Sequence, residues 1–148
     1  MAAVRDVATY ILKEKGRMTT MKLQKLIYYS QAWSLVWDEK PLFAERIEAW
    51  ANGPVCPDLY NLHRGRYTVD DEEMGGNVAK LRSEEKESID AVLDYYGDKS
   101  AQWLSDLSHL EAPWNEARGE CPPGEACSNE ITHASMAEFY SSLCDNES

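Results

Sequence analysis

The segment from Met21 to Trp37 constrains the fold more than any other part of the chain. Its start, Met21-Lys-Leu-Gln-Lys, keeps a polar face, but from Leu26 onward apolar residues run nearly all the way round a helix. A helix of this kind has to be covered on most sides, so it is expected at the centre of the domain. Thr19 or Thr20 is the expected N-cap, and the helix is expected to end near Trp37.

The flanking segments have one-sided apolar patterns that suit helices packed around this centre. These stripes predict helices at residues 4–15 and 58–63, a third that Ser83 caps and Gly97 ends, a fourth between Ser100 and Pro113, and a last one after Thr132. Residues 47–51 alternate as a short strand does, although Pro54 and Pro57 argue against a plain two-strand hairpin there. The sequence predicts a polar loop at 68–80. The expected fold class is mainly α, a single compact helical domain over residues 1–148 with a minor short β element around residues 46–55.

Length and cysteine content favour a cytoplasmic protein whose fold needs neither a disulfide nor a metal ion. A chain of 148 residues with 43% hydrophobic residues can bury a core without a metal or a disulfide. No apolar run approaches the roughly 20 residues of a membrane helix, and the first residues carry no signal-peptide pattern, so neither a membrane nor secretion is expected. Cys121 and Cys127 are separated by five residues, which matches no zinc motif. We therefore expect reduced thiols, no metal, no cofactor and no disulfide.

The net charge of −11 is concentrated in the second half of the chain. Residues 1–68 contain 10 basic and 7 acidic residues, and residues 69–148 contain 5 and 19, which gives +3 and −14. The acidic half repels phosphate backbones, so nucleic-acid binding is not expected. It favours fast encounter with a basic protein partner, although the same acidity also keeps a protein soluble.

Motifs for catalysis are absent from the sequence. There is no phosphate-binding glycine loop, no nucleophile elbow and no His-Glu-x-x-His segment, and the three histidines fall on separate predicted elements. Trp50 is the most informative aromatic residue, because it lies on the polar side of its strand, opposite Ile47 and Ala49. Such a side chain suits an interface anchor, and the alternative is that a neighbouring helix covers it.

Several short motifs occur in an order and spacing that resemble one known family. The first is Met21-Lys-Leu-Gln-Lys-Leu-Ile-Tyr-Tyr-Ser-Gln31, where Ile27 and Ser30 are the only departures from the family pattern. The others are Lys40-Pro-Leu-Phe43, Glu48-Ala-Trp50, Gly53-Pro-Val55, Leu59-Tyr60, Tyr96-Gly97, Leu104-Ser105, Leu107-Ser-His109, Pro113-Trp114 and Ala117-Arg118. With these motifs the chain resembles the Panacea domain family, also called SocA-like or GepA-type phage-associated proteins. The loop at 119–128, with its two cysteines, is not part of the family pattern.

The resemblance implies an antitoxin of a toxin–antitoxin module, often borne by a prophage, that binds its toxin directly. One branch of the family delivers its toxin to a Clp-type protease, so a protease adaptor is a second possible mode. The resemblance implies no enzyme activity and no cofactor, and for this bare domain no appended DNA-binding segment is expected. The expected partner-binding residues are Glu48, Trp50, Asn52, Pro54, Tyr60, His109, Trp114 and Arg118. The alternative is a small enzyme or ligand-binding domain with a polar pocket around Glu48, His109 and Arg118.

Overall fold

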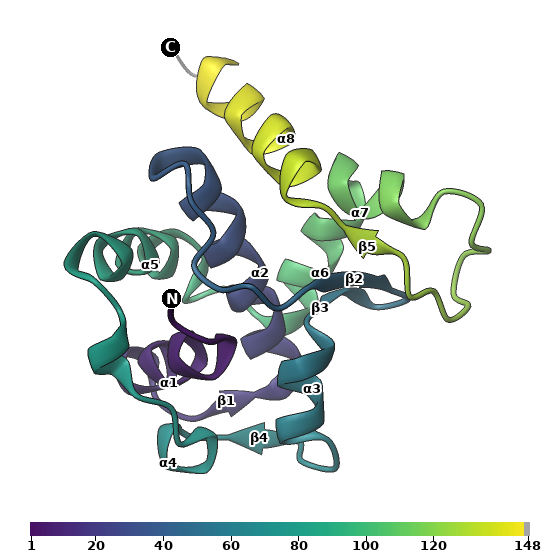
Figure 1. The fold of residues 1–148 in the computed structure, drawn as a ribbon. Coiled ribbons are helices and arrows are strands. Elements are labelled where there is room, and N and C mark those ends of the chain that lie inside the picture. The colour runs from purple at the N-terminus through teal and green to yellow at the C-terminus, as the bar shows by residue number, and fades with distance from the viewer. Residues whose placement is uncertain (147–148) are drawn as a thin grey trace.

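The structure is a computed structural model that describes residues 1–146, and it is mainly helical (Figure 1). This confirms the predicted fold class. The helices are α1 (Val4–Lys15), α2 (Thr20–Trp37), α3 (Pro57–His63), α4 (Asp71–Met74), α5 (Ser83–Tyr96), α6 (Ala101–Leu110), α7 (Ala112–Arg118) and α8 (His133–Asn146), with a short 3-10 turn at Val78–Lys80.

Helix α2 occupies the centre, as its sequence predicts. Its N-cap is Thr19, whose Oγ1 accepts a hydrogen bond of 3.1 Å from the backbone N–H of Lys22. Leu26 and Ile27 are fully buried, and α1, α5, α6 and α8 all pack against the helix (Figure 1). The core therefore forms around one helix that has almost no solvent-facing side.

A buried polar cluster attaches α8 to this centre. The Tyr29 and Tyr140 hydroxyls both donate to Glu111 Oε1, at 2.7 and 2.8 Å, and the hydroxyls of Tyr28 and Tyr140 lie 2.9 Å apart. Burial raises the pKa of Glu111, whereas the two tyrosine hydrogen bonds act in the opposite direction. Each buried polar atom here has a partner, so the cluster fixes how α2, α7 and α8 meet.

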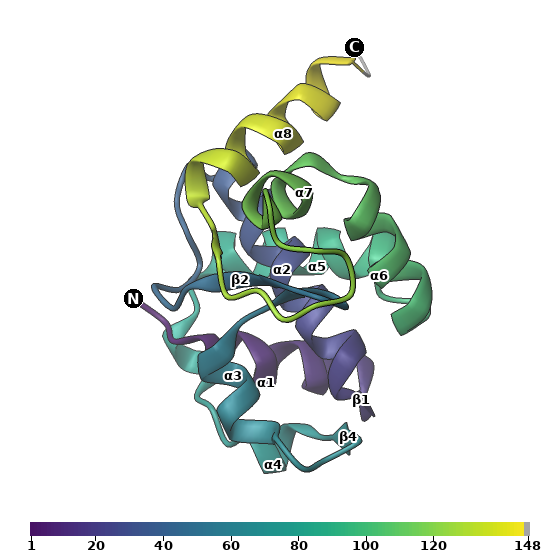
Figure 2. The ribbon, with the colours of Figure 1, turned by 90° about the vertical axis from the view of Figure 1, so that its right-hand side faces the viewer.

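The β structure consists of two small antiparallel sheets. Strand β1 (Met18–Thr19) pairs with β4 (Thr68–Val69), and a second sheet has the order β3-β2-β5, with β2 at Ile47–Trp50, β3 at Gly53–Val55 and β5 at Glu130–Ile131. In Figure 2 the segment between α7 and β5 passes in front of β2.

The expectation that prolines exclude a hairpin at residues 47–55 is wrong. Pro54 lies opposite Ala49 in an antiparallel β2–β3 pair with a two-residue turn. The backbone N–H of Ala49 donates to the carbonyl of Asn129, and its own carbonyl accepts from Arg118. Because Ala49 makes its hydrogen bonds elsewhere, this pair needs no N–H from Pro54, and a proline is tolerated there.

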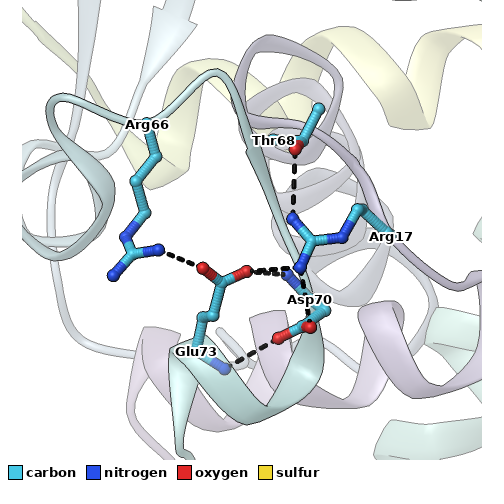
Figure 3. Close-up of polar contacts among 5 residues, drawn as sticks. All are labelled: Arg17, Arg66, Thr68, Asp70 and Glu73. Atoms are coloured by element: carbon cyan, nitrogen blue, oxygen red, sulfur yellow. Dashed lines mark hydrogen bonds and ion pairs between the residues drawn. The ribbon is translucent and has the colours of Figure 1, made fainter.

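The predicted loop after β4 is ordered by a short helix and an ion-pair cluster (Figure 3). Asp70 and Glu73 form a capping box at α4, in which each side chain accepts from the other's backbone N–H. Arg17 donates to Thr68 Oγ1 at 3.1 Å and pairs with Asp70 at 2.8 Å and Glu73 at 3.0 Å, while Arg66 pairs with Glu73 from the other side. The positive charges of Arg17 and Arg66 therefore balance the acidic residues from which the sequence predicted a loop.

Candidate functional site

The principal concave site is a cleft of about 680 Å³ between the start of α2, the β2–β3 hairpin, α3 and the segment before β5. We call it the hairpin cleft. It is lined by Thr20, Met21, Gln24, Lys25, Glu48, Trp50, Ala51, Asn52, Val55, Tyr60, His63, Ala126, Cys127 and Ser128. A cavity of this size, with mostly apolar walls and a few polar groups, is typical of a binding site.

Aromatic rings form one wall of the hairpin cleft. The ring of Trp50 meets that of Tyr60 edge to face, with centroids 5.0 Å apart, and Tyr60 meets His63 in the same way at 5.5 Å. Trp50 is half-buried and Tyr60 is 37% exposed, so both rings offer surface to a ligand. Rigid aromatic side chains of this kind are favoured as interface anchors.

Glu48 is held in place by neighbours within the hairpin. Its Oε1 accepts from the indole N–H of Trp50 at 2.9 Å, and its Oε2 pairs with Arg46 Nε at 3.0 Å. Arg46 also donates to the carbonyl of Ser128 at 3.0 Å, which joins the segment before β5 to the hairpin. Glu48 therefore orients the Trp50 ring and has its charge balanced by an arginine.

Lys25 lies at the floor of the hairpin cleft and is 1% exposed. Within residues 1–146 its ammonium takes part in none of the ion pairs of the structure and in none of its side-chain hydrogen bonds. Burial lowers the pKa of Lys25 to about 8, because an apolar surrounding disfavours the charged form. The chain thus keeps a desolvated cation at the base of an open cleft.

Gly53 provides the space for the end of the Lys25 side chain. Its φ is +123°, which favours glycine, and a Cβ at this position would lie 2.5 Å from Lys25 Cε and 3.3 Å from Lys25 Nζ. The Asn52-Gly53-Pro54 turn therefore shapes the cleft floor as well as the hairpin.

Gln24 joins α2 to Cys56 and to His63 at the end of α3 through three contacts. Its Nε2 lies 3.3 Å from the Cys56 carbonyl and 3.0 Å from His63 Nε2, while its Oε1 accepts from the Cys56 N–H at 2.9 Å. Burial lowers the pKa of His63, which favours the neutral ring that accepts from the Gln24 amide. His63 is a structural part of the wall.

A second group of side chains holds the hairpin from outside the cleft. The Trp114 indole N–H donates to the Trp50 carbonyl at 2.8 Å, and Arg118 donates to the carbonyls of Ala49, Pro122 and Glu125 at 3.0, 2.7 and 2.8 Å. The Arg118 guanidinium also lies 5.1 Å from the centre of the Trp114 ring. Arg118 is 4% exposed, so it braces the hairpin and the following loop from within.

The amino-acid sequence of this chain matches one known family. Residues 23–115, more than half of the chain, match the sequence model of the antitoxin SocA-like, Panacea domain. The chain belongs to the Panacea domain family. No curated protein and no solved structure matches it. The matched range includes α3, α6, both strands of the hairpin and all of α2 after its first turn.

The eight expected partner-binding residues of this Panacea domain fall into two groups. Glu48, Trp50, Asn52 and Tyr60 line the hairpin cleft. The other four lie outside its lining and support the hairpin, namely Pro54 in β3, Trp114, Arg118 and His109. The three residues of the alternative polar pocket are therefore divided, because only Glu48 reaches the cleft.

His109 packs behind the hairpin. Its ring lies 4.2 Å from that of Trp114, and its Nε2 is buried without a hydrogen-bond partner among the described residues. Burial lowers the pKa of His109, and the charge of Lys25 lowers it further. The neutral imidazole is thus favoured beside the buried ammonium.

Sequence reasoning missed Lys25, Gln24 and His63 as cleft residues. A signal for Lys25 exists, since it directly precedes Leu26 and the run of apolar residues that surrounds the central helix. A lysine so close to that run has to be buried or to reach a cleft.

The prediction of no disulfide is wrong, because the structure joins Cys121 to Cys127. Arg118 holds the carbonyls of Pro122 and Glu125, which folds the loop back until the two cysteine Cα atoms lie 6.1 Å apart. This separation is within the range that a disulfide spans. Cys127 lines the hairpin cleft, so the bridge supports one of its walls.

We expect Cys121→Ser to lower the free energy of unfolding by about 2 kcal/mol in oxidising buffer, since the bridge closes a short loop in the unfolded chain. Denaturant unfolding of both proteins measures this difference. With dithiothreitol present, the wild-type protein and the variant should unfold together. Equal stability without reductant would show that the bridge is not formed.

Within the part of the chain that the structure describes, no three His, Cys, Asp or Glu side chains are grouped so that they could hold a metal ion. No helix in residues 1–146 is long and apolar enough to cross a bilayer.

Proposed function

We propose that this Panacea domain is an antitoxin that neutralises a cognate toxin protein by binding it at the hairpin cleft. Family membership carries this proposal, because the matched range supplies most of the cleft, including its aromatic wall. The domain performs no chemistry of its own. We place it in the cytoplasm, encoded beside its toxin, often in a prophage.

The cleft suits protein recognition because a rigid aromatic centre is surrounded by polar groups. The indole N–H of Trp50 donates to Glu48, and its ring packs against that of Tyr60. Because both contacts already fix the Trp50 side chain, little conformational freedom is lost on binding. Asn52 at the turn is exposed and offers amide hydrogen bonds at the rim. Trp114 and Arg118 stabilise the hairpin without touching the partner.

The acidic second half of the chain accelerates encounter with a basic toxin. Its charge of −14 acts at long range and is screened by salt over about 8–10 Å. The association rate is therefore expected to fall as ionic strength rises, with a smaller change in the dissociation rate.

We expect Trp50→Ala to weaken toxin binding roughly 30-fold, since a buried aromatic anchor contributes about 2 kcal/mol. The measurement is co-expression of each variant with the neighbouring gene, scored for growth, followed by calorimetry with the purified gene product. Trp103→Ala is the matched control, because Trp103 is 40% exposed on α6 and lies outside the cleft. A folded Trp50→Ala protein that still neutralises at full strength would remove Trp50 from the binding site.

Direct inhibition and delivery to a Clp-type protease differ in what happens to the toxin. Direct inhibition restores growth while the toxin level in the cell stays constant. An adaptor shortens the lifetime of the toxin, and rescue disappears when the protease is deleted. Toxin half-life, measured with and without the antitoxin, distinguishes the two modes.

A small enzyme or ligand-binding domain around Glu48, His109 and Arg118 is less well supported. Glu48 is paired with Arg46, and Arg118 is occupied by three backbone carbonyls. These residues serve the shape of the hairpin, which favours a binding module.

A further inference from the structure

The unpartnered ammonium of Lys25 is the feature of the hairpin cleft that the proposed function does not yet explain. Of the described residues that line the cleft, Lys25 is the only lysine or arginine. It comes from the second turn of the central helix, and its end is packed against the hairpin at Gly53. A buried charge is costly unless it is paired, so a structure that retains one has a place for a counter-charge.

None of the groups around Lys25 supplies this counter-charge. The Oγ of Ser108 is near the Lys25 end, but a hydroxyl is neutral and supplies no negative charge. Glu48 is already paired with Arg46. His109, whose pKa is lowered by burial and then by the charge of Lys25, adds no negative charge. The anionic group has to come from outside the described residues.

The cleft walls indicate what kind of group it is. A single ammonium balances a single carboxylate, whereas a phosphate dianion would leave one negative charge unbalanced in a cleft whose described lining holds no second lysine or arginine. Met21, Val55 and the rings of Trp50 and Tyr60 provide apolar surface for the residues that carry this carboxylate. The combination suits an acidic side chain, or a chain terminus, next to bulky apolar residues.

We propose that the hairpin cleft receives a carboxylate of the partner protein, carried by an apolar peptide segment, and that Lys25 pairs with it. The inference rests on the proposed function and names the feature that the partner presents. It is compatible with a basic toxin, because long-range steering depends on net charge and this contact involves one group. Lys25 then anchors the segment while Trp50 and Tyr60 cover it.

The cleft can be tested directly with 3-phenylpropionate, a carboxylate on an aromatic body, and 3-phenylpropionamide, its neutral analogue. Titration into ¹⁵N-labelled protein is followed at the Trp50 indole N–H and the Gly53 amide, with the Trp103 indole as reference. The carboxylate is expected to shift the first two signals and to bind at least tenfold more tightly than the amide. Equal binding of both compounds would overturn the proposal, as would stronger binding of inorganic phosphate.

Lys25→Met removes the ammonium and keeps the rest of the side-chain length, and it should weaken binding of 3-phenylpropionate at least tenfold. Lys22→Met is the matched control, since Lys22 is on the same helix and outside the cleft lining. Unchanged binding by Lys25→Met would overturn the role of Lys25. The comparison of carboxylate and amide on the wild-type protein does not depend on any variant folding.

Binding of the neighbouring gene product separates this inference from the proposed function. Lys25→Met is expected to weaken that complex at least tenfold, and Lys22→Met to leave it unchanged. A complex that needs Trp50 but tolerates Lys25→Met would overturn the inference and leave the proposed function intact. If the wild-type protein binds no such product, the proposed function fails, and the inferred partner carboxylate fails with it even if 3-phenylpropionate binds.

Discussion

Replacement of Leu26 by alanine is expected to lower the free energy of unfolding by about 2–5 kcal/mol. Leu26 is fully buried on the helix that α1, α5, α6 and α8 surround, so the cavity left by the missing carbons has little freedom to collapse. Urea or guanidinium unfolding of the wild-type protein and the variant measures the loss. Ile27→Ala tests the same property at the adjacent buried position.

Leu110→Ala is the matched control for this prediction. It deletes the same atoms from a leucine that is 81% exposed at the end of α6, so its effect should stay within about 0.5 kcal/mol. A loss below about half a kcal/mol at both Leu26 and Ile27 would mean that α2 is not the centre of the domain.

Lys25→Met is expected to stabilise the protein by about 3 kcal/mol at pH 7. Folding lowers the pKa of Lys25 from 10.5 to about 8, and each unit of such a shift corresponds to about 1.4 kcal/mol. Keeping this ammonium away from water without a partner lowers the stability of the folded protein. Methionine removes the charge at nearly the same side-chain volume. Chemical unfolding at pH 7 measures the gain.

The pH dependence gives a second measurement of the same effect. Below pH 8 the lysine is protonated in both states, and the full penalty is present. Between about pH 8 and 10.5 the unfolded chain binds more protons than the folded one, so wild-type stability rises relative to Lys25→Met. The difference in unfolding free energy between wild type and Lys25→Met should therefore disappear by pH 10.5. A variant that is less stable than wild type at pH 7 would show that the ammonium has a stabilising partner.

A stabilising variant that weakens binding would be informative about selection on this chain. Binding sites often keep groups that destabilise the unbound fold, because the bound partner supplies the counter-charge or contact that these groups lack. For Lys25, the stability gain and the loss of carboxylate binding are expected together.

The candidate site was predictable in part. Trp50 was selected because it breaks the apolar alternation of its strand, and the structure places its ring in the cleft beside Tyr60. Asn52 and Glu48 also line the cleft. Arg118 was expected at the same surface, but it is buried behind the hairpin. A sequence pattern can indicate that an arginine contacts the hairpin, but it does not indicate which face of the hairpin the side chain approaches.

By itself, the sequence determined the longer helices and the central place of α2, whereas α4 lies in a segment predicted as a loop and α7 was not predicted. Caps such as Thr19 and apolar periodicity act within a few residues, so they can be read without knowing the fold. The tertiary structure alone decided the hairpin, the bridge between Cys121 and Cys127, and the burial of Lys25. The hairpin depends on a segment far away in the chain: Arg118 reaches Ala49 across 69 residues, and this contact frees the hairpin from needing the N–H that Pro54 lacks. The bridge joins cysteines only six residues apart, but it depends on how Arg118 holds the loop between them. Local preference cannot specify such meetings, because they are set by how the helices pack around α2.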